Sequence, residues 1–263
     1  MTRLVCLGDS FTEGMCDDLR PDGQHLGWAD RVAEGLARAS SPELPAPIEY
    51  ANLAVRGKLL DQVIAEQVPV AVTMAPDVVT FHAGPNDMLR RGADVAALRR
   101  RYEDAVATLT ATGARVVLFT SLTRTGGSGR VADRLEARFL AFNAMVREVA
   151  ARHGSVLIDD AAVTALTDRR FWAPDRLHLN AQGHARVAAN VLHGLGVTDP
   201  NVLGGRAGWW AEPLPRAPRT TRREALAADL AWVRVHLLPW LGRRLRGVSS
   251  GDGMAPKDAR VIP

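Results

Sequence analysis

Residues 3–14 read RLVCLGDSFTEG, an apolar run followed by a turn that carries one serine. The apolar part, residues 3–8, predicts a buried strand, and Ser10 follows directly after its carboxyl end. In an open α/β sheet the ligand crevice lies outside the carboxyl ends of the strands, so this position suits a nucleophile. A serine hydroxyl is a weak nucleophile at neutral pH and needs a base that is oriented by a third group.

A base and an orienting carboxylate occur together late in the chain, in the segment DRLHLN over residues 175–180. Asp175 precedes His178 by three residues, so one tight turn lets its carboxylate bond the ring nitrogen nearer the backbone. The other ring nitrogen is then free to face a serine. The pattern predicts Ser10, Asp175 and His178 as the catalytic residues.

Two further blocks end strand-like runs and can deliver hydrogen-bond donors to the same crevice. They are NLAVRG over residues 52–57 and GPND over residues 84–87. Gly57 offers a backbone N–H that no side chain blocks, and Asn86 offers its side-chain amide. The sequence therefore also predicts groups that can stabilise a negatively charged oxygen.

At these four blocks the sequence resembles the SGNH, or GDSL, hydrolases, which are esterases and lipases named for a Ser, a Gly, an Asn and a His. The resemblance covers about residues 3–196. It implies a catalytic triad of Ser10, His178 and Asp175. It also implies an oxyanion hole with three donors: the backbone N–H groups of Ser10 and Gly57 and the amide of Asn86.

The resemblance implies a serine esterase that hydrolyses small-molecule carboxylic esters through an acyl-enzyme intermediate. Two alternatives remain open: an acyltransferase with the same triad, and an α/β binding module without catalysis. An apolar wall for the substrate is expected from Phe11, Met88, Leu89 and Trp172.

Other polar residues are interpreted as structural. Asp9 and Asp87 are expected to support their loops, and His184 to pack the turn around His178. No cofactor is implied, because no Gly-x-Gly-x-x-Gly motif follows the first strand. No metal is implied either, because the histidines lack zinc-ligand spacing.

Strand and helix signals alternate along the chain, which predicts a flavodoxin-like, three-layer α/β/α sandwich with a parallel sheet of about five strands and a C-terminal helical appendage. Strands are expected near residues 3–8, 47–52, 77–83, 115–120 and 155–159. Helices are expected over residues 28–39, 59–72, 95–112, 130–152 and 181–195.

The chain is expected to divide into a catalytic domain, residues 1–199, and a C-terminal extension. The extension comprises a linker or draped segment, residues 200–219, a basic amphipathic helical tail, residues 220–246, and a disordered end, residues 247–263. From residue 200 onward there are 11 Lys and Arg against 5 Asp and Glu.

The helical tail carries an apolar stripe, Leu226, Leu230, Val233 and Leu237, which Pro239 is expected to interrupt. We expect the tail to dock on the catalytic domain or on a second subunit, in preference to an anionic membrane surface. Binding to nucleic acid is not expected.

The 263 residues are 47% hydrophobic, enough for one sizeable core. The two cysteines are too few for a disulfide framework and are expected to be reduced. No signal-peptide pattern precedes the first strand, so a cytoplasmic location is expected.

Overall fold

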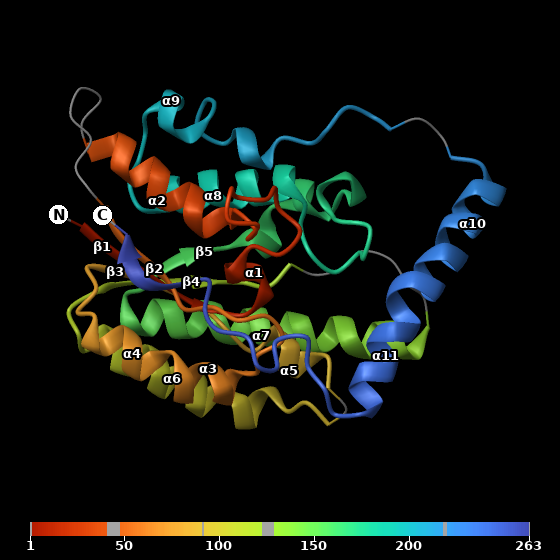
Figure 1. Ribbon diagram of the computed structural model, residues 1–263, viewed down its shortest axis with the longest axis horizontal. Coiled ribbons are helices and arrows are strands. Elements are labelled where there is room, and N and C mark those ends of the chain that lie inside the picture. The colour runs from red at the N-terminus through yellow and green to blue at the C-terminus, as the bar shows by residue number, and fades with distance from the viewer. Residues whose placement is uncertain (1, 41–47, 91, 123–128, 218–219, 263) are drawn as a thin grey trace.

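The computed structural model describes residues 2–40, 48–90, 92–122, 129–217 and 220–262. A six-stranded sheet runs through the middle of the molecule, with helices on both faces (Figure 1). The strands are β1 (Thr2–Gly8), β2 (Ile48–Asn52), β3 (Val78–His82), β4 (Arg115–Phe119), β5 (Val156–Ile158) and β6 (Asp258–Ile262).

The strand order across the sheet is β5-β4-β3-β1-β2-β6. The five strands from β1 to β5 pair in parallel, and the order 2-1-3-4-5 is that of flavodoxin-like folds. The predicted three-layer fold with about five parallel strands is therefore confirmed. A sixth strand, β6, joins the β2 edge in antiparallel orientation.

Two helical layers cover the sheet. The helices are α1 (Ser10–Glu13), α2 (Gly27–Ser40), α3 (Leu60–Glu66), α4 (Val68–Thr73), α5 (Pro85–Met88), α6 (Val95–Thr110), α7 (Arg130–His153), α8 (Ala181–Gly194), α9 (Pro200–Leu203), α10 (Arg222–Trp232) and α11 (Leu238–Leu245). Short 3-10 turns occupy Asp160–Ala162, Thr164–Thr167, Arg169–Phe171 and Trp209–Ala211. Within the described residues, no helix combines the length and apolar character needed to cross a membrane.

The apolar run of β1 explains both layers, because successive side chains of a strand point to opposite faces. Leu4 and Cys6 pack in the cluster under α2 and α8, whereas Val5 and Leu7 pack in the cluster under the helices from α3 to α7. All four side chains are fully buried. A strand that is buried on both faces reads as a continuous apolar run, as this one does.

The segment before the C-terminal helices is draped over α8. The guanidinium of Arg186 on α8 donates hydrogen bonds to the backbone carbonyls of Trp209, Trp210 and Glu212. The Trp210 side chain is buried. Residues 209–212 therefore lie against α8, and residues 218–219 lie outside the described part.

The C-terminal helices lie within the expected range, residues 220–246, but are not interrupted where expected. Pro239 does not end the helix, because α11 continues to Leu245. A π-helical turn, Val233–Leu237, precedes Pro239 and widens the backbone there. Such a turn relaxes the i to i−4 hydrogen bonding that a proline interrupts.

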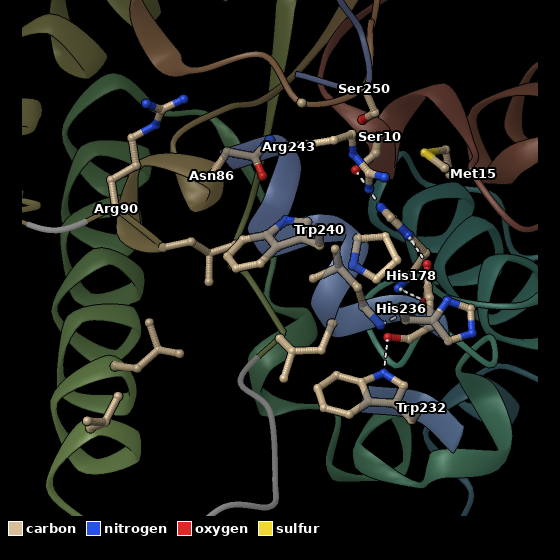
Figure 2. Close-up of a pocket in the computed structure, with 18 of the residues that line it drawn as sticks. Ser10, Met15, Asn86, Arg90, His178, Trp232, His236, Trp240, Arg243 and Ser250 are labelled. Carbon is tan, nitrogen blue, oxygen red and sulfur yellow. Dashed lines mark hydrogen bonds and ion pairs between the residues drawn. The ribbon is translucent and has the colours of Figure 1, made fainter. Parts of the chain in front are cut away.

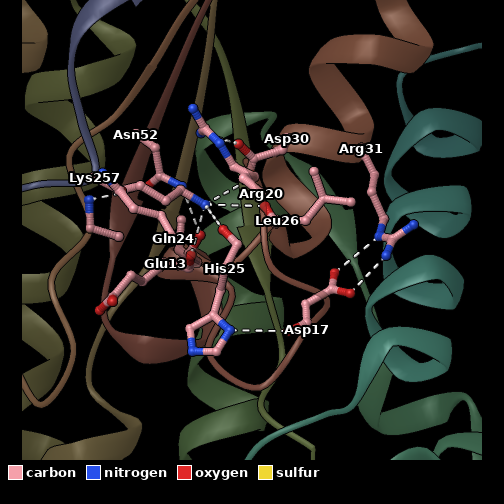
Figure 3. A network of polar contacts seen from close by, with 12 residues as sticks. Glu13, Asp17, Arg20, Gln24, His25, Leu26, Asp30, Arg31, Asn52 and Lys257 are labelled. Carbon is pink, nitrogen blue, oxygen red and sulfur yellow. Dashed lines mark hydrogen bonds and ion pairs between the residues drawn. The ribbon is translucent and has the colours of Figure 1, made fainter. Parts of the chain in front are cut away.

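The prediction of disorder over residues 247–263 is wrong for the described residues up to 262, which include a strand; residue 263 lies outside the described part. Residues 258–262 form β6, which pairs with β2 at Tyr50 and Asn52. Immediately before β6, Lys257 enters the core (Figure 3).

Lys257 is the anchor of this segment. Its side chain is 3% exposed, and its ammonium lies 2.6 Å from the Asp30 carboxylate. It also donates to the backbone carbonyls of Glu13, His25 and Leu26 at 2.9, 2.8 and 3.1 Å. A charged lysine is buried only when it is paired and hydrogen-bonded, and here both conditions are met.

Replacing Lys257 with Met is expected to lower the free energy of unfolding by about 3 kcal/mol, because Asp30 loses a buried partner. Arg20 still contacts Asp30 at 3.1 Å, so the expected loss of stability is at the lower end of the range for breaking a buried ion pair. Chemical denaturation measures the change. As a control, Lys58→Met breaks an ion pair with the exposed Glu66 and should cost less than about 1 kcal/mol. Equal losses in the two variants would contradict the anchoring role.

Candidate active site

Ser10 lies at the start of α1, two residues after the end of β1 at Gly8. Asp9 caps the turn, since its carboxylate accepts a hydrogen bond from the backbone N–H of Phe11 at 3.1 Å. The turn packs tightly on β3: a Cβ on Gly8 would lie 2.5 Å from the carbonyl oxygen of His82. This packing holds Ser10 at the carboxyl edge of the sheet.

Asp175 and His178 lie on a tight turn next to Ser10 (Figure 2). The Asp175 carboxylate accepts hydrogen bonds from the backbone N–H groups of Leu177 and His178 at 2.9 and 3.1 Å. His178 Nδ1 lies 2.6 Å from Asp175 Oδ2, and His178 Nε2 lies 3.0 Å from Ser10 Oγ. The structure thus brings together a serine and a histidine that are 168 positions apart in the chain.

The surroundings shift the pKa values of both members of this pair. Burial lowers the pKa of His178, but hydrogen bonds to Asp175 and Cys16 and the charge of Asp175 outweigh burial and raise it to about 9. Burial raises the pKa of Asp175, but the hydrogen bond and charge of His178 and two backbone N–H groups lower it to about 2. At neutral pH the pair therefore favours its charged form.

Two backbone N–H groups at this edge, those of Ser10 and Gly57, have no partner among the described residues. In the described part of the chain, neither the N–H of Ser10 nor that of Gly57 donates a hydrogen bond, and both residues line one cavity. Gly57 has a φ of 76°, and a Cβ there would lie 2.2 Å from the Oγ of Ser249. This position requires glycine both for its conformation and for the space it leaves.

The side-chain amide of Asn86, unlike the two backbone N–H groups, already has hydrogen-bond partners. Its Nδ2 donates to Asp9 Oδ2 and to the carbonyl oxygen of Lys58, both at 3.0 Å. Both N–H groups of the amide are used, so an oxyanion would have to share or replace one of these acceptors.

The residues interpreted as structural do make supporting contacts. Asp9 holds both Asn86 and the turn of Ser10. Asp87 accepts a hydrogen bond from the backbone N–H of Leu60 at 2.9 Å. His184 Nε2 lies 3.0 Å from the carbonyl oxygen of Met15.

A cavity of about 910 Å³ opens at Ser10. One wall belongs to the catalytic core and includes Leu89. The opposite wall is formed by the C-terminal helices, from which Trp232, His236 and Trp240 point toward the cavity (Figure 2). The sequence analysis did not assign these three residues to the site. The available signal was that Trp232 and Trp240 flank the apolar stripe of the helical tail.

The C-terminal wall is attached directly to the turn that holds the histidine. Trp232 Nε1 donates to the carbonyl oxygen of Asp175 at 2.8 Å. Arg176 forms an ion pair with Asp229 at 2.7 Å and stacks over the Trp232 ring. These contacts are those expected of a tail docked on the catalytic domain, although Leu226 and Leu230 of the predicted stripe remain exposed.

Residues 6–186 match the model of the GDSL-like lipase/acylhydrolase family. The chain belongs to this family. It is therefore a carboxylic ester hydrolase, and the alternative of a binding module without catalysis is set aside. A search of curated proteins finds no match.

Several solved structures resemble this GDSL-family hydrolase. LAE5, an α/β hydrolase from the metagenome of Lake Arreo, Spain, is 22% identical with a TM-score of 0.62, over 74% of this chain and 95% of that chain. A lipase/acylhydrolase from Enterococcus faecalis is 24% identical with a TM-score of 0.60, over 74% and 95%. Axe2, an acetylxylan esterase from Geobacillus stearothermophilus, is 21% identical with a TM-score of 0.61, over 74% and 94%. At these identities the likeness shows the shared fold.

Of the four residues expected to form the apolar wall, three line a pocket at Ser10 and one is buried in the core. Leu89 lines the large cavity, and it also lines a smaller pocket of about 100 Å³ together with Phe11 and Trp172. Met88 is fully buried in the core, so the prediction for it is wrong. The short helix α5 turns Met88 inward, against the helical layer that includes α7.

Both cysteines of the hydrolase are free. Cys16 lies beside the site, with its Sγ 3.9 Å from Asp175 Oδ2. Within the described ranges, Cys16, Asp175 and His178 form the one group of three potential metal ligands. The hydrogen bond between Asp175 and His178 already accounts for the closeness of two of them.

The pH dependence of hydrolysis should be displaced to alkaline values. If His178 accepts the serine proton, it does so only when neutral, so kcat/KM should rise with pH through about 9. Asp175→Asn should move the midpoint to lower pH and lower kcat by about 10⁴-fold. Rates with a neutral chromogenic ester, corrected for spontaneous hydrolysis, provide the measurement. A midpoint at the ordinary histidine value of 6.5 would contradict the coupling.

Proposed function

We propose that the protein hydrolyses carboxylic esters through a Ser10–His178–Asp175 triad and an acyl-enzyme intermediate. The observation that carries the proposal is the pair of hydrogen bonds from Ser10 Oγ to His178 Nε2, 3.0 Å, and from His178 Nδ1 to Asp175, 2.6 Å. A nucleophile, a base and a group that orients the base are the three parts that activate a serine.

In the first half of the reaction, Ser10 Oγ attacks the ester carbonyl carbon and His178 Nε2 takes the hydroxyl proton. The tetrahedral intermediate collapses, the bond between the carbonyl carbon and the alcohol oxygen breaks, and His178 returns the proton to the departing alcohol. The acyl group remains on Ser10 as an ester. Asp175 keeps the imidazole oriented and stabilises its charged form.

In the second half, water replaces the alcohol. His178 takes a proton from the attacking water, and the resulting intermediate expels Ser10 Oγ, which recovers its proton from His178. The products are a carboxylic acid and the free enzyme.

The negative oxygen of both tetrahedral intermediates needs donors that are already in place. The unpartnered N–H groups of Ser10 and Gly57 are suited to this role. Asn86 is the third donor, and it acts by exchanging its hydrogen bond with Asp9 or Lys58 for one with the oxyanion.

The two cavities at Ser10 suggest where the acyl and the alcohol portions of a substrate bind. The pocket of about 100 Å³ beside Phe11 and Trp172 suits a short acyl group. The cavity of about 910 Å³ leaves room for a larger alcohol portion. Axe2, which shares the fold, is an acetylxylan esterase, and acetyl is an acyl group of this size.

A fluorophosphonate should label Ser10 alone, because only an activated serine reacts with this reagent. Intact-protein mass spectrometry should show one adduct, which disappears in Ser10→Ala and forms far more slowly in His178→Ala. Ser250→Ala is the matched control, since Ser250 lines the same cavity but has no histidine partner among the described residues. An adduct that survives in Ser10→Ala would refute the proposed nucleophile.

Removal of the Asn86 amide should lower kcat by about 10²- to 10³-fold with little change in KM, because an oxyanion donor acts on charge that develops in the transition state. Asp87→Asn disturbs the same loop at Leu60 without removing the donor, and its kcat should stay far closer to that of the wild type. Steady-state kinetics and thermal melting are measured on both variants. A loss of stability alone in Asn86→Ala would show that Asn86 only supports the loop.

A further inference from the structure

The large cavity beside Ser10 has an excess of positive charge. Its only lining carboxylate among the described residues is Asp175, which is bonded to His178. Four arginines line it: Arg90, Arg134, Arg138 and Arg243. A cleft lined by charges of one sign raises the local concentration of ligands of the opposite sign.

These arginines have no carboxylate partner within the described part of the chain. Arg138 donates to the backbone carbonyl oxygens of Met88 and Arg90, at 3.4 and 2.9 Å. The side chains of Arg90, Arg134 and Arg243 make no hydrogen bond or ion pair with other described residues. Their charges are therefore available to a ligand.

Arg243 lies closer to the Ser10 end of the cavity than Arg90 does. Figure 2 shows its side chain directed from α11 toward the Ser10 end of the cavity, whereas Arg90 lies at the other end. Arg243 is half-buried, so part of its hydration is lost without a compensating partner. A planar guanidinium in such a position binds a carboxylate or a phosphate with two parallel hydrogen bonds.

The geometry points to a substrate class. We propose that the alcohol portion of the ester carries an anionic group, a carboxylate or a phosphate, which Arg243 binds. This inference rests on the proposed esterase function, since the short acyl group occupies the small pocket and leaves the cationic cavity to the alcohol portion. Specificity is then supplied by the C-terminal helices, separately from the triad.

Matched acetyl esters test the proposal. The neutral ester is 4-acetoxybenzamide, and the two anionic esters are 4-acetoxybenzoate and 4-acetoxyphenyl phosphate, which distinguish a carboxylate from a phosphate. Each enzymatic rate is divided by the rate of spontaneous hydrolysis. We expect kcat/KM for at least one anionic ester to exceed that of the neutral ester by about 10- to 100-fold, the range of a hydrogen-bonded charge pair.

Variants of α11 assign the preference to Arg243. Arg243→Gln should reduce the ratio of anionic to neutral kcat/KM by about 10- to 100-fold, and Arg243→Lys should retain part of it. Arg246→Gln is the matched control, because Arg246 follows α11, is exposed and lies outside the cavity lining. Added salt should lower the ratio in the wild-type protein, which tests the charge effect without a substitution. A ratio near one in the wild type, or one unchanged in Arg243→Gln, would overturn the proposal.

Binding to the Ser10→Ala protein separates this inference from the proposed function. Isothermal titration with the same three esters should show tighter binding of an anionic ester, and adding Arg243→Gln should remove the difference. Preferential binding without hydrolysis by the wild type would refute the esterase mechanism and uphold the anion site. Hydrolysis by Ser10 with equal binding of all three esters would refute the anion site and uphold the esterase mechanism.

Discussion

The parallel pairing of β1, β2 and β3 is the constraint on which the active site depends. Parallel strands end at one edge of the sheet, so the loops that follow them converge there. Ser10 follows β1, Gly57 follows β2 and Asn86 follows β3. Because β1 is buried on both faces, a shift of its register would disturb two core clusters at once. The core therefore fixes the relative positions of these groups.

The turn that carries Asp175 and His178 adds an electrostatic constraint to this edge. Asp175 is held by backbone N–H groups of its own turn and by His178, so its charge stays directed at the imidazole. The same turn receives a hydrogen bond from Trp232 through the carbonyl of Asp175. The turn that carries His178 and the C-terminal wall of the cavity are thus joined by a direct hydrogen bond.

The C-terminal extension completes the site from outside the residues that match the family. The match ends at residue 186, whereas α10 and α11 span residues 222–245. Two contacts hold this segment against the core: Trp232, at the end of α10, bonds the turn of Asp175 and His178, and Lys257, beyond α11, is buried against Asp30. In the function proposed above, ester cleavage and the selection of the alcohol portion belong to different segments of one chain.

Local pattern by itself determined most of the core and predicted the residues that are proposed to carry the chemistry. The apolar runs placed five parallel strands to within two residues, because burial on both faces of a strand leaves a continuous apolar run in the local sequence. The spacing of Asp175 and His178 predicted their hydrogen bond, since three residues are enough to close a turn.

Only the tertiary structure decided the rest, because it depends on contacts between residues far apart in the chain. The polar, glycine-rich composition of residues 247–263 indicated disorder, yet Lys257 finds acceptors 227 to 244 positions away that local pattern does not reveal. Met88 and Leu89 are adjacent apolar residues, and only the packing of α5 sends one into the core and the other to the cavity. Arg243 belongs to a basic tail in sequence, and it lines the cavity because the folded core orients α11 across Ser10.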